Sequence, residues 1–252
     1  MAEGLARSAA ADPEPATPDP AVHAVGVGPG DPAHLTDRAR TIFGDADVVV
    51  GFDPVLDVIR TETDARLLAC GYDDQSETLA ALADVVRGGA TGAAALMGDP
   101  NVSGYQFLGR IERAVDGAVR VVPGISSVQI AAGRARTPLE QSTIVSLHRR
   151  GSLAGAFGRL EAAADATHLI VLPRPYDWMP AEVAGRLVSA GVAVDRAALV
   201  FERLTLPDES VTRTTVGGLA DRATPDFTDL SILVVRAPEP TPVTDRETEG
   251  TP

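Results

Sequence analysis

The chain has no lysine, one cysteine and few aromatic residues. Its 22 basic residues are therefore all arginines, and they are outnumbered by 35 carboxylates, which gives a formal net charge of −13. Such an excess of negative charge disfavours nucleic acid as a partner, because the phosphate backbone would be repelled. The single cysteine, Cys70, excludes an internal disulfide framework and a thiolate metal cluster.

The sequence also has no apolar run long enough to cross a membrane. Its N-terminus lacks the basic-then-apolar pattern of a secretory signal. We therefore expect a cytoplasmic protein without a membrane partner. The acidic, lysine-free composition fits a protein kept soluble at very high salt, which is the explanation we favour, and a genome rich in alanine and arginine is the alternative. Neither origin bears on the reaction.

With 252 residues, 44% of them hydrophobic, the chain can bury a sizeable core in one large or two small domains. Residues 1–20 are rich in Ala, Pro and acidic residues, and residues 238–252 are rich in Pro and acidic residues, so we expect a disordered leader and a disordered tail. Strands and helices alternate between them, as in a mostly parallel sheet. The expected strands are 22–27, 47–51, 92–97, 119–122, 142–147, 168–172, 197–201, 210–216 and 230–236, and the expected helices are 36–43, 76–87, 103–115, 126–134, 155–164 and 180–190.

A change of pattern near residues 137–141 indicates a domain linker, because Pro138 disfavours a continuing helix. The predicted fold is therefore two α/β domains, at 21–136 and 137–237. The Thr- and Val-rich segment 209–216 suits an antiparallel strand, so we expect a mixed sheet in the second domain.

The first strand ends in a glycine-rich turn, Gly26 to Asp31, with the sequence GVGPGD. Glycines let the backbone turn sharply and leave it uncovered, and ligands commonly bind at such turns in α/β proteins. The dinucleotide fingerprint is not met, because its last glycine would fall at Asp31. The turn is either a ligand-binding loop or a tight strand-to-helix connection.

Two further turns follow apolar strands, at 97–105 and 122–127. Asp99 can accept hydrogen bonds from a ribose or an amine, or it can simply start an Asp-Pro turn. Ser126 and Ser127 can bind a ligand carboxylate at a helix N-terminus, or they can simply cap that helix.

Together the three turns resemble the signature segments of a known family. GVGPGD at 26–31, GDPNVSGY at 98–105 and PGISS at 123–127 resemble those of the tetrapyrrole (corrin/porphyrin) methylases. These are S-adenosylmethionine-dependent enzymes of corrinoid and siroheme synthesis. The resemblance covers residues 21 to about 236. PGISSVQ at 123–129 and IVSLHRR at 144–150 are similar to the branch that methylates C5 of cobalt-precorrin-7, or precorrin-6Y, although Arg149 replaces a glycine of that pattern.

The resemblance implies the tetrapyrrole methylase fold, with the methyl donor S-adenosylmethionine in a cleft between two α/β domains. Later strands near 201–203 and 230–232 also contribute contacts in this family, at residues that the resemblance does not fix. The donor-binding residues implied by the matched motifs are Pro29, Met97, Gly98, Asp99, Val102, Ser126, Ser127 and Leu172.

The substrate of this branch carries many carboxylates, for which the planar fork of arginine is suited. We expect arginines near the cleft, and the candidate substrate-binding residues are Tyr105, His148, Arg149 and Arg150. Methyl transfer demands mainly proximity and orientation, so no catalytic residue is singled out. Asp99, His148, Glu202 or solvent can take the released proton. The four histidines are scattered without metal-ligand spacing, and no metal is expected.

Several alternatives stay open. The same three loops serve tetrapyrrole methylases that act at other ring carbons, and also the related diphthine synthase. A non-catalytic nucleotide-binding module would explain the glycine loops alone. The resemblance further implies a homodimer, and a separate C15-methyltransferase/decarboxylase as a possible partner.

Overall fold

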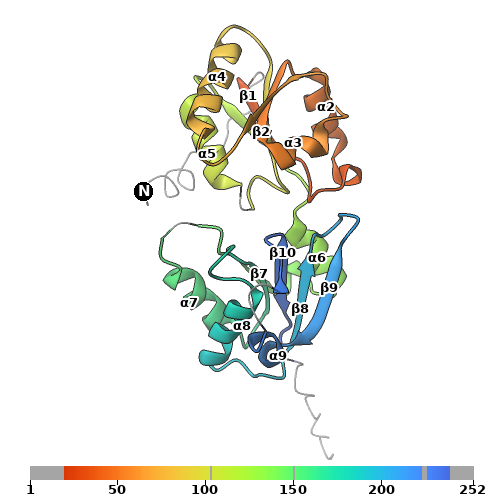
Figure 1. The fold of residues 1–252 in the computed structure, drawn as a ribbon, viewed down its shortest axis with the longest axis vertical. Helices are drawn as coiled ribbons and strands as arrows, with labels where there is room; N and C mark the ends of the chain where they lie inside the picture. The colour runs from red at the N-terminus through yellow and green to blue at the C-terminus, as the bar shows by residue number, and fades with distance from the viewer. Residues whose placement is uncertain (1–19, 103, 150, 223–225, 239–252) are drawn as a thin grey trace, which may run out of the picture.

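The computed structural model describes residues 20–102, 104–149, 151–222 and 226–238. The predicted leader and tail therefore fall almost wholly outside the described residues. Figure 1 shows two α/β units, one above the other, joined through the segment that contains α6. In the described part of the chain, every helix is too short or too polar to cross a bilayer.

The upper unit is built on a parallel sheet in the order β3-β2-β4-β1-β5. Alternate side chains of its strands enter two cores, with Val25 and Val49 on one face and Ala24 and Val50 on the other. Helices cover both faces, as parallel sheets require. Figure 1 shows α2 and α3 on one face and α4 and α5 on the other. The elements are β1 (Val22–Gly26), η1 (Pro32–His34), α2 (Asp37–Asp45), β2 (Val48–Phe52), α3 (Asp53–Ile59), β3 (Arg66–Cys70), α4 (Gln75–Arg87), β4 (Gly92–Leu96), α5 (Tyr105–Ala114) and β5 (Val119–Val122).

The lower unit contains the expected mixed sheet, in the order β6-β7-β10-β8-β9. Only β6 and β7 are parallel, and β9 pairs with β8 in the antiparallel sense that its Thr- and Val-rich sequence predicts. Helices α7, α8 and α9 lie on one face of this sheet. The elements are η2 (Leu139–Gln141), β6 (Ser142–Ser146), α7 (Ala154–Ala163), β7 (His168–Leu172), α8 (Pro180–Ser189), β8 (Ala197–Glu202), β9 (Ser210–Thr215), α9 (Val216–Ala220) and β10 (Ser231–Val235).

Helix α6 (Ser127–Ala135) connects the two units. The sequence places it in the first domain, before the predicted boundary at 136/137. Its apolar side chains nevertheless pack on the second sheet, where Val128 and Ala132 meet Ile170 and Phe201. The turn before α6 therefore leads from the first sheet directly onto the second. The elements that the sequence did not predict are α3, β3, α9 and the short 3-10 helices η1 and η2. The remaining elements agree with the predicted ranges to within about two residues.

Candidate functional site: a cavity between the two sheets

The three glycine turns meet one another backbone to backbone. Gly28 and Gly98 form an isolated β-bridge, with amide-to-carbonyl distances of 3.3 and 2.8 Å. A Cβ added to Gly26 would lie 2.5 Å from the carbonyl oxygen of Gly98 and 2.7 Å from Cα of Gly124. The close approach of three main chains explains why glycine stands at each of these positions. The turns thus form one structural unit at the carboxyl ends of β1, β4 and β5.

Asp99 holds two of these turns together through its carboxylate. Its Oδ1 accepts a hydrogen bond from the amide of Asn101 at 2.7 Å, which is the Asx-type turn that Asp-Pro sequences favour. Its Oδ2 accepts one from the amide of Gly124 at 3.1 Å, across to the third turn. Both carboxylate oxygens therefore bind the protein's own backbone.

The third turn ends in a capping box at the start of α6. The Ser126 hydroxyl accepts from the amide of Val128 at 3.2 Å, and Gln129 Oε1 accepts from the amide of Ser126 at 2.7 Å. Capping, the simpler of the two sequence interpretations, is thus what the Ser126 side chain does here. Because α6 packs on the second sheet, the cap also fixes this turn where the two units meet.

A cavity of about 610 Å³ opens beside this unit, between the carboxyl edge of the first sheet and the second sheet. Its volume is that of an ordinary small-molecule site. The first unit contributes the ends of β1, β2, β3 and β4. The second unit contributes His148 and Leu172, together with the segments after β8 and at the start of β10.

Seven of the eight predicted donor-binding residues line this cavity. They are Pro29, Met97, Gly98, Val102, Ser126, Ser127 and Leu172. Asp99 does not line it, because its carboxylate is turned to Asn101 and Gly124. Their contact with a donor stays a prediction, and for Asp99 the geometry supports a positioning role instead.

Of the predicted substrate-binding residues, only His148 lines the cavity. Tyr105 begins α5 and Arg149 follows His148, yet neither is among the lining residues. Arg150 lies outside the described residues. The expected gathering of arginines is also not found among the described residues of this site. Among the described lining residues, Arg203 alone is an arginine.

Sequence reasoning missed one wall of the cavity entirely. This wall comes from the ends of β2 and β3, and the residues it includes are Phe52, Asp53, Pro54, Val55, Cys70, Gly71 and Tyr72. The available signal was weak, since both strands end without the Gly-Pro pattern of the other turns. From the second unit, the segments near 201–203 and 230–232 line the cavity with Arg203, Leu230, Ser231 and Ile232, and Leu204, Leu206 and Asp229 lie beside them. Their contact with a donor stays a prediction.

The cavity offers both apolar surface and unused hydrogen-bonding capacity. Ser231 is only 5% exposed and lines the cavity, yet its Oγ has no partner among the described residues. A buried hydroxyl of this kind normally bonds a ligand or a water. Met97, Leu172 and Ile232 add apolar surface. This combination suits a small molecule that has both apolar and hydrogen-bonding parts.

Desolvation favours the neutral form of two titratable groups at the cavity. Burial lowers the pKa of His148, although a backbone hydrogen bond with Pro173 and the nearby charge of Asp229 act in the opposite direction. Burial likewise raises the pKa of the Cys70 thiol to about 11. At neutral pH the site therefore presents an unprotonated imidazole and a protonated thiol.

Because the pKa of His148 is lower in the folded state, its protonation should favour unfolding. Below pH 6.5, the ordinary pKa of histidine, the unfolded chain binds a proton at this residue that the folded chain does not bind. Stability should therefore fall as pH drops through this range, and His168, whose pKa burial also lowers, adds to the loss. Thermal melts of the wild type and of His148→Asn, at pH 7.5 and 5.5, test this. The variant should lose less stability, and an equal loss would contradict the assignment.

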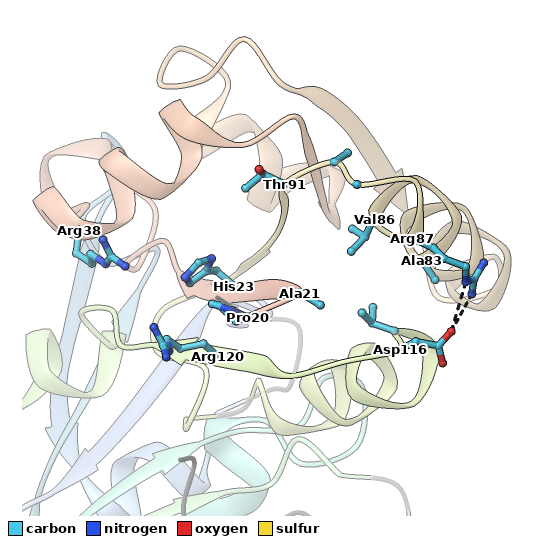
Figure 2. Close-up of a pocket in the computed structure, with 13 residues that line it drawn as sticks. Pro20, Ala21, His23, Arg38, Ala83, Val86, Arg87, Thr91, Asp116 and Arg120 are labelled. Atoms are coloured by element: carbon cyan, nitrogen blue, oxygen red, sulfur yellow. Dashed lines mark hydrogen bonds and ion pairs between the residues drawn. The ribbon is translucent and has the colours of Figure 1, made fainter. Parts of the chain in front are cut away.

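A second cavity, of about 520 Å³, lies at the opposite edge of the first sheet. Figure 2 shows His23, Arg38 and Arg120 on one side of it and the ion pair of Arg87 with Asp116, at 3.2 Å, on the other. This cavity lies at the amino ends of the strands, away from the glycine turns. Ligands of open α/β sheets bind at the carboxyl ends, so the first cavity is the candidate site.

Within the described ranges, no three His, Cys, Asp or Glu side chains gather as a metal site would require.

The structure is that of an α/β protein with two sheets and a candidate ligand site between them. The family model of the Tetrapyrrole (Corrin/Porphyrin) Methylases matches residues 21–220, and the chain belongs to this family. It is therefore an S-adenosylmethionine-dependent tetrapyrrole methyltransferase.

Individual relatives are distant but match over most of their length. A probable cobalt-precorrin-7 C(5)-methyltransferase of Methanocaldococcus jannaschii is 27% identical, over 86% of this chain and 99% of that protein. The cobalt-precorrin-4 C(11)-methyltransferase of Priestia megaterium is 28% identical, over 79% and 81%. A uroporphyrin-III C-methyl transferase structure from Thermus thermophilus, complexed with S-adenyl homocysteine, has a TM-score of 0.65 at 24% identity, covering 85% of this chain and 96% of that one.

Proposed function

We propose that the chain methylates C5 of cobalt-precorrin-7, or of the cobalt-free precorrin-6Y, in cobalamin biosynthesis. The observation that carries this proposal is the similarity to the Methanocaldococcus jannaschii relative, which extends over 99% of that protein. The segment IVSLHRR at 144–150, which resembles the C5 branch, supports the same ring position.

The donor belongs in the half of the cavity nearest the glycine turns. The residues that would hold it are Pro29, Met97, Gly98, Val102, Ser126, Ser127 and Leu172, with the free hydroxyl of Ser231 as an additional hydrogen-bonding group. S-adenosylmethionine supplies an electrophilic methyl group. The protein's task is to hold the accepting carbon in line with that group and to exclude water from the cleft.

Methylation of a ring carbon releases one proton, and His148 is the best-placed side chain to accept it. Of the three candidate bases, His148 alone lines the cavity, and desolvation lowers the pKa of its imidazole, which favours the unprotonated form at neutral pH. Asp99 is bonded to two backbone amides. Glu202 does not line the cavity, and its Oε1 accepts from the amide of Thr228 at 2.8 Å.

Carbon-13 NMR of the product tests the ring position. The purified protein is incubated without oxygen with ¹³C-methyl-labelled S-adenosylmethionine and cobalt-precorrin-7, and in parallel with precorrin-6Y. One enriched methyl resonance bonded to C5 is expected. A methyl group on another carbon would keep the family and discard the C5 assignment. Omission of the protein is the control for non-enzymatic transfer.

A second candidate is methylation of C11 of cobalt-precorrin-4, because the Priestia megaterium relative is slightly more identical, at 28%. Its match covers less of both proteins, 79% and 81%, so we place it second. Cobalt-precorrin-4 in a third incubation distinguishes the two, since only the true substrate should accept the label.

The assembly state is part of the same proposal. We expect a homodimer in the cytoplasm, and a separate protein that methylates and decarboxylates at C15. Light scattering of the eluted protein should give twice the chain mass of 26.1 kDa. A single-chain mass would contradict the dimer.

A further inference from the structure

Three of the chain's few aromatic side chains meet at one wall of the cavity. The sequence has only six phenylalanines, three tyrosines and one tryptophan. The ring of Phe52 lies 5.1 Å from that of Tyr72 and 5.3 Å from that of Phe107, centroid to centroid, in tilted arrangements. These distances are typical of stabilising aromatic pairs. All three residues line the cavity.

The cluster runs from the core to the surface. Phe107, on α5, is 8% exposed and packs in the first unit's core. Phe52 ends β2 and lies between the other two rings, while Tyr72, two residues after β3, is 79% exposed. A buried ring thus anchors the middle one, which leaves the outermost ring open to a ligand at the mouth of the cavity.

Strand order separates this wall from the glycine turns. In the sheet β3-β2-β4-β1-β5, the three turns follow β4, β1 and β5, which are adjacent, whereas Phe52 and Tyr72 follow β2 and β3 on the other side. The carboxyl edge therefore has a glycine half and an aromatic half, which meet at β4. The cavity must hold a methyl donor and a methyl acceptor in contact with each other. Its two halves offer a separate surface for each of them.

The aromatic half is also uncharged over much of its surface. Pro54 and Val55 are apolar, and the Cys70 thiol stays protonated because burial raises its pKa to about 11. Asp53 and, from the second unit, Asp229 and Arg203 complete the lining with charged groups. An uncharged aromatic surface beside charged groups suits a molecule with a flat conjugated face and a polar periphery.

We propose that Phe52 and Tyr72 form a stacking wall that positions the flat face of the tetrapyrrole acceptor, opposite the donor's glycine half. This inference deepens the proposed function and rests on it for the identity of the acceptor. It assigns this contact with the substrate to Tyr72 in place of Tyr105, the tyrosine predicted from the sequence as a substrate-binding residue, because Tyr105 does not line the cavity.

Removal of the Tyr72 ring should weaken acceptor binding alone. We expect Tyr72→Ala to raise the KM for the corrinoid by about tenfold, the size of one aromatic stacking contact, with little change in kcat or in the KM for S-adenosylmethionine. Tyr72→Phe retains the ring and should behave as the wild type. Tyr176→Ala is the matched control, because Tyr176 is 89% exposed on the second unit and does not line the cavity.

A binding measurement keeps this test independent of turnover. Equilibrium dialysis with a stable cobalt corrinoid that carries free carboxylates should show about tenfold weaker binding to Tyr72→Ala than to the wild type, Tyr72→Phe or Tyr176→Ala. Equal binding by Tyr72→Ala and the wild type would overturn the stacking wall and leave the methyltransferase assignment untouched. Failure of the wild type to bind any corrinoid would overturn both. Weaker binding of S-adenosylmethionine by Tyr72→Ala would place the donor, not the acceptor, on this wall.

Discussion

Replacement of Gly124 by alanine should abolish detectable binding of S-adenosylhomocysteine, the product of the methyl donor. The new Cβ would lie 2.3 Å from the carbonyl oxygen of Gly98 and 2.7 Å from the carbonyl carbon of Gly26. Both are backbone atoms, which cannot rotate away as a side chain would. The three turns must then separate, at a cost of about 1–3 kcal/mol in stability, and the surface that they form for the donor is lost.

Gly133→Ala provides the matched control. Gly133 lies in α6, the helix that follows the third turn, and nothing stands within 4 Å of an added Cβ. Since alanine is the better helix former, this variant should gain up to about 1 kcal/mol in stability and bind normally. Calorimetric titration and thermal melts of both variants compare them with the wild type. Wild-type affinity in Gly124→Ala would refute the close packing of the turns as the basis of the donor site.

Asp99→Ala should weaken binding of S-adenosylhomocysteine by about tenfold, although Asp99 does not line the cavity. The substitution removes acceptors for the amides of Asn101 and Gly124, and hydrogen bonds to charged groups contribute about 1.5–3 kcal/mol each. Part of that loss should appear in binding, since 1.4 kcal/mol corresponds to a tenfold change. The substitution removes the hydrogen bond that joins the second and third turns. Binding is therefore weakened because the turns are no longer held in place, and not because a contact with the ligand is lost.

Two further variants distinguish the positioning role of Asp99 from an effect of its charge. Asp99→Asn retains one acceptor oxygen and should lose less affinity than Asp99→Ala. Asp116→Ala removes a carboxylate of the same kind from the second cavity, where it pairs with Arg87 at 3.2 Å, and should bind as the wild type. If Asp99→Asn were as weak as Asp99→Ala, the charge itself, and not the pair of accepted bonds, would be essential.

The glycine turns could be predicted from the sequence because their constraint is local. A short apolar strand followed by Gly-Pro-Gly or Gly-Asp-Pro specifies a sharp turn at a sheet edge. Six of the seven predicted donor-binding residues in these turns line the cavity. The mixed sheet followed equally from local composition, since the Thr- and Val-rich β9 is antiparallel as expected.

What the sequence did not reveal depends on contacts between distant segments. Phe52 and Tyr72 are twenty residues apart, and only the pairing of β2 with β3 brings their rings together. The sequence predicts α6 as the last helix of the first domain, but its apolar face packs on the second sheet. An aspartate at position 99 is able to contact a ligand, and the sequence predicted that it does. Its carboxylate instead accepts a hydrogen bond from the amide of Gly124, which lies 25 residues away in the sequence.

Amide hydrogen exchange of the wild type, with and without S-adenosylhomocysteine, tests the central claim that the donor binds between the two sheets. Slower exchange is expected in the three turns, around residues 26–31, 97–102 and 123–127, and in segment 230–232 of the second unit. Residues 86–91 and 115–120, at the second cavity, should exchange as before. Slower exchange confined to the second cavity, or no change in either place, would contradict the account.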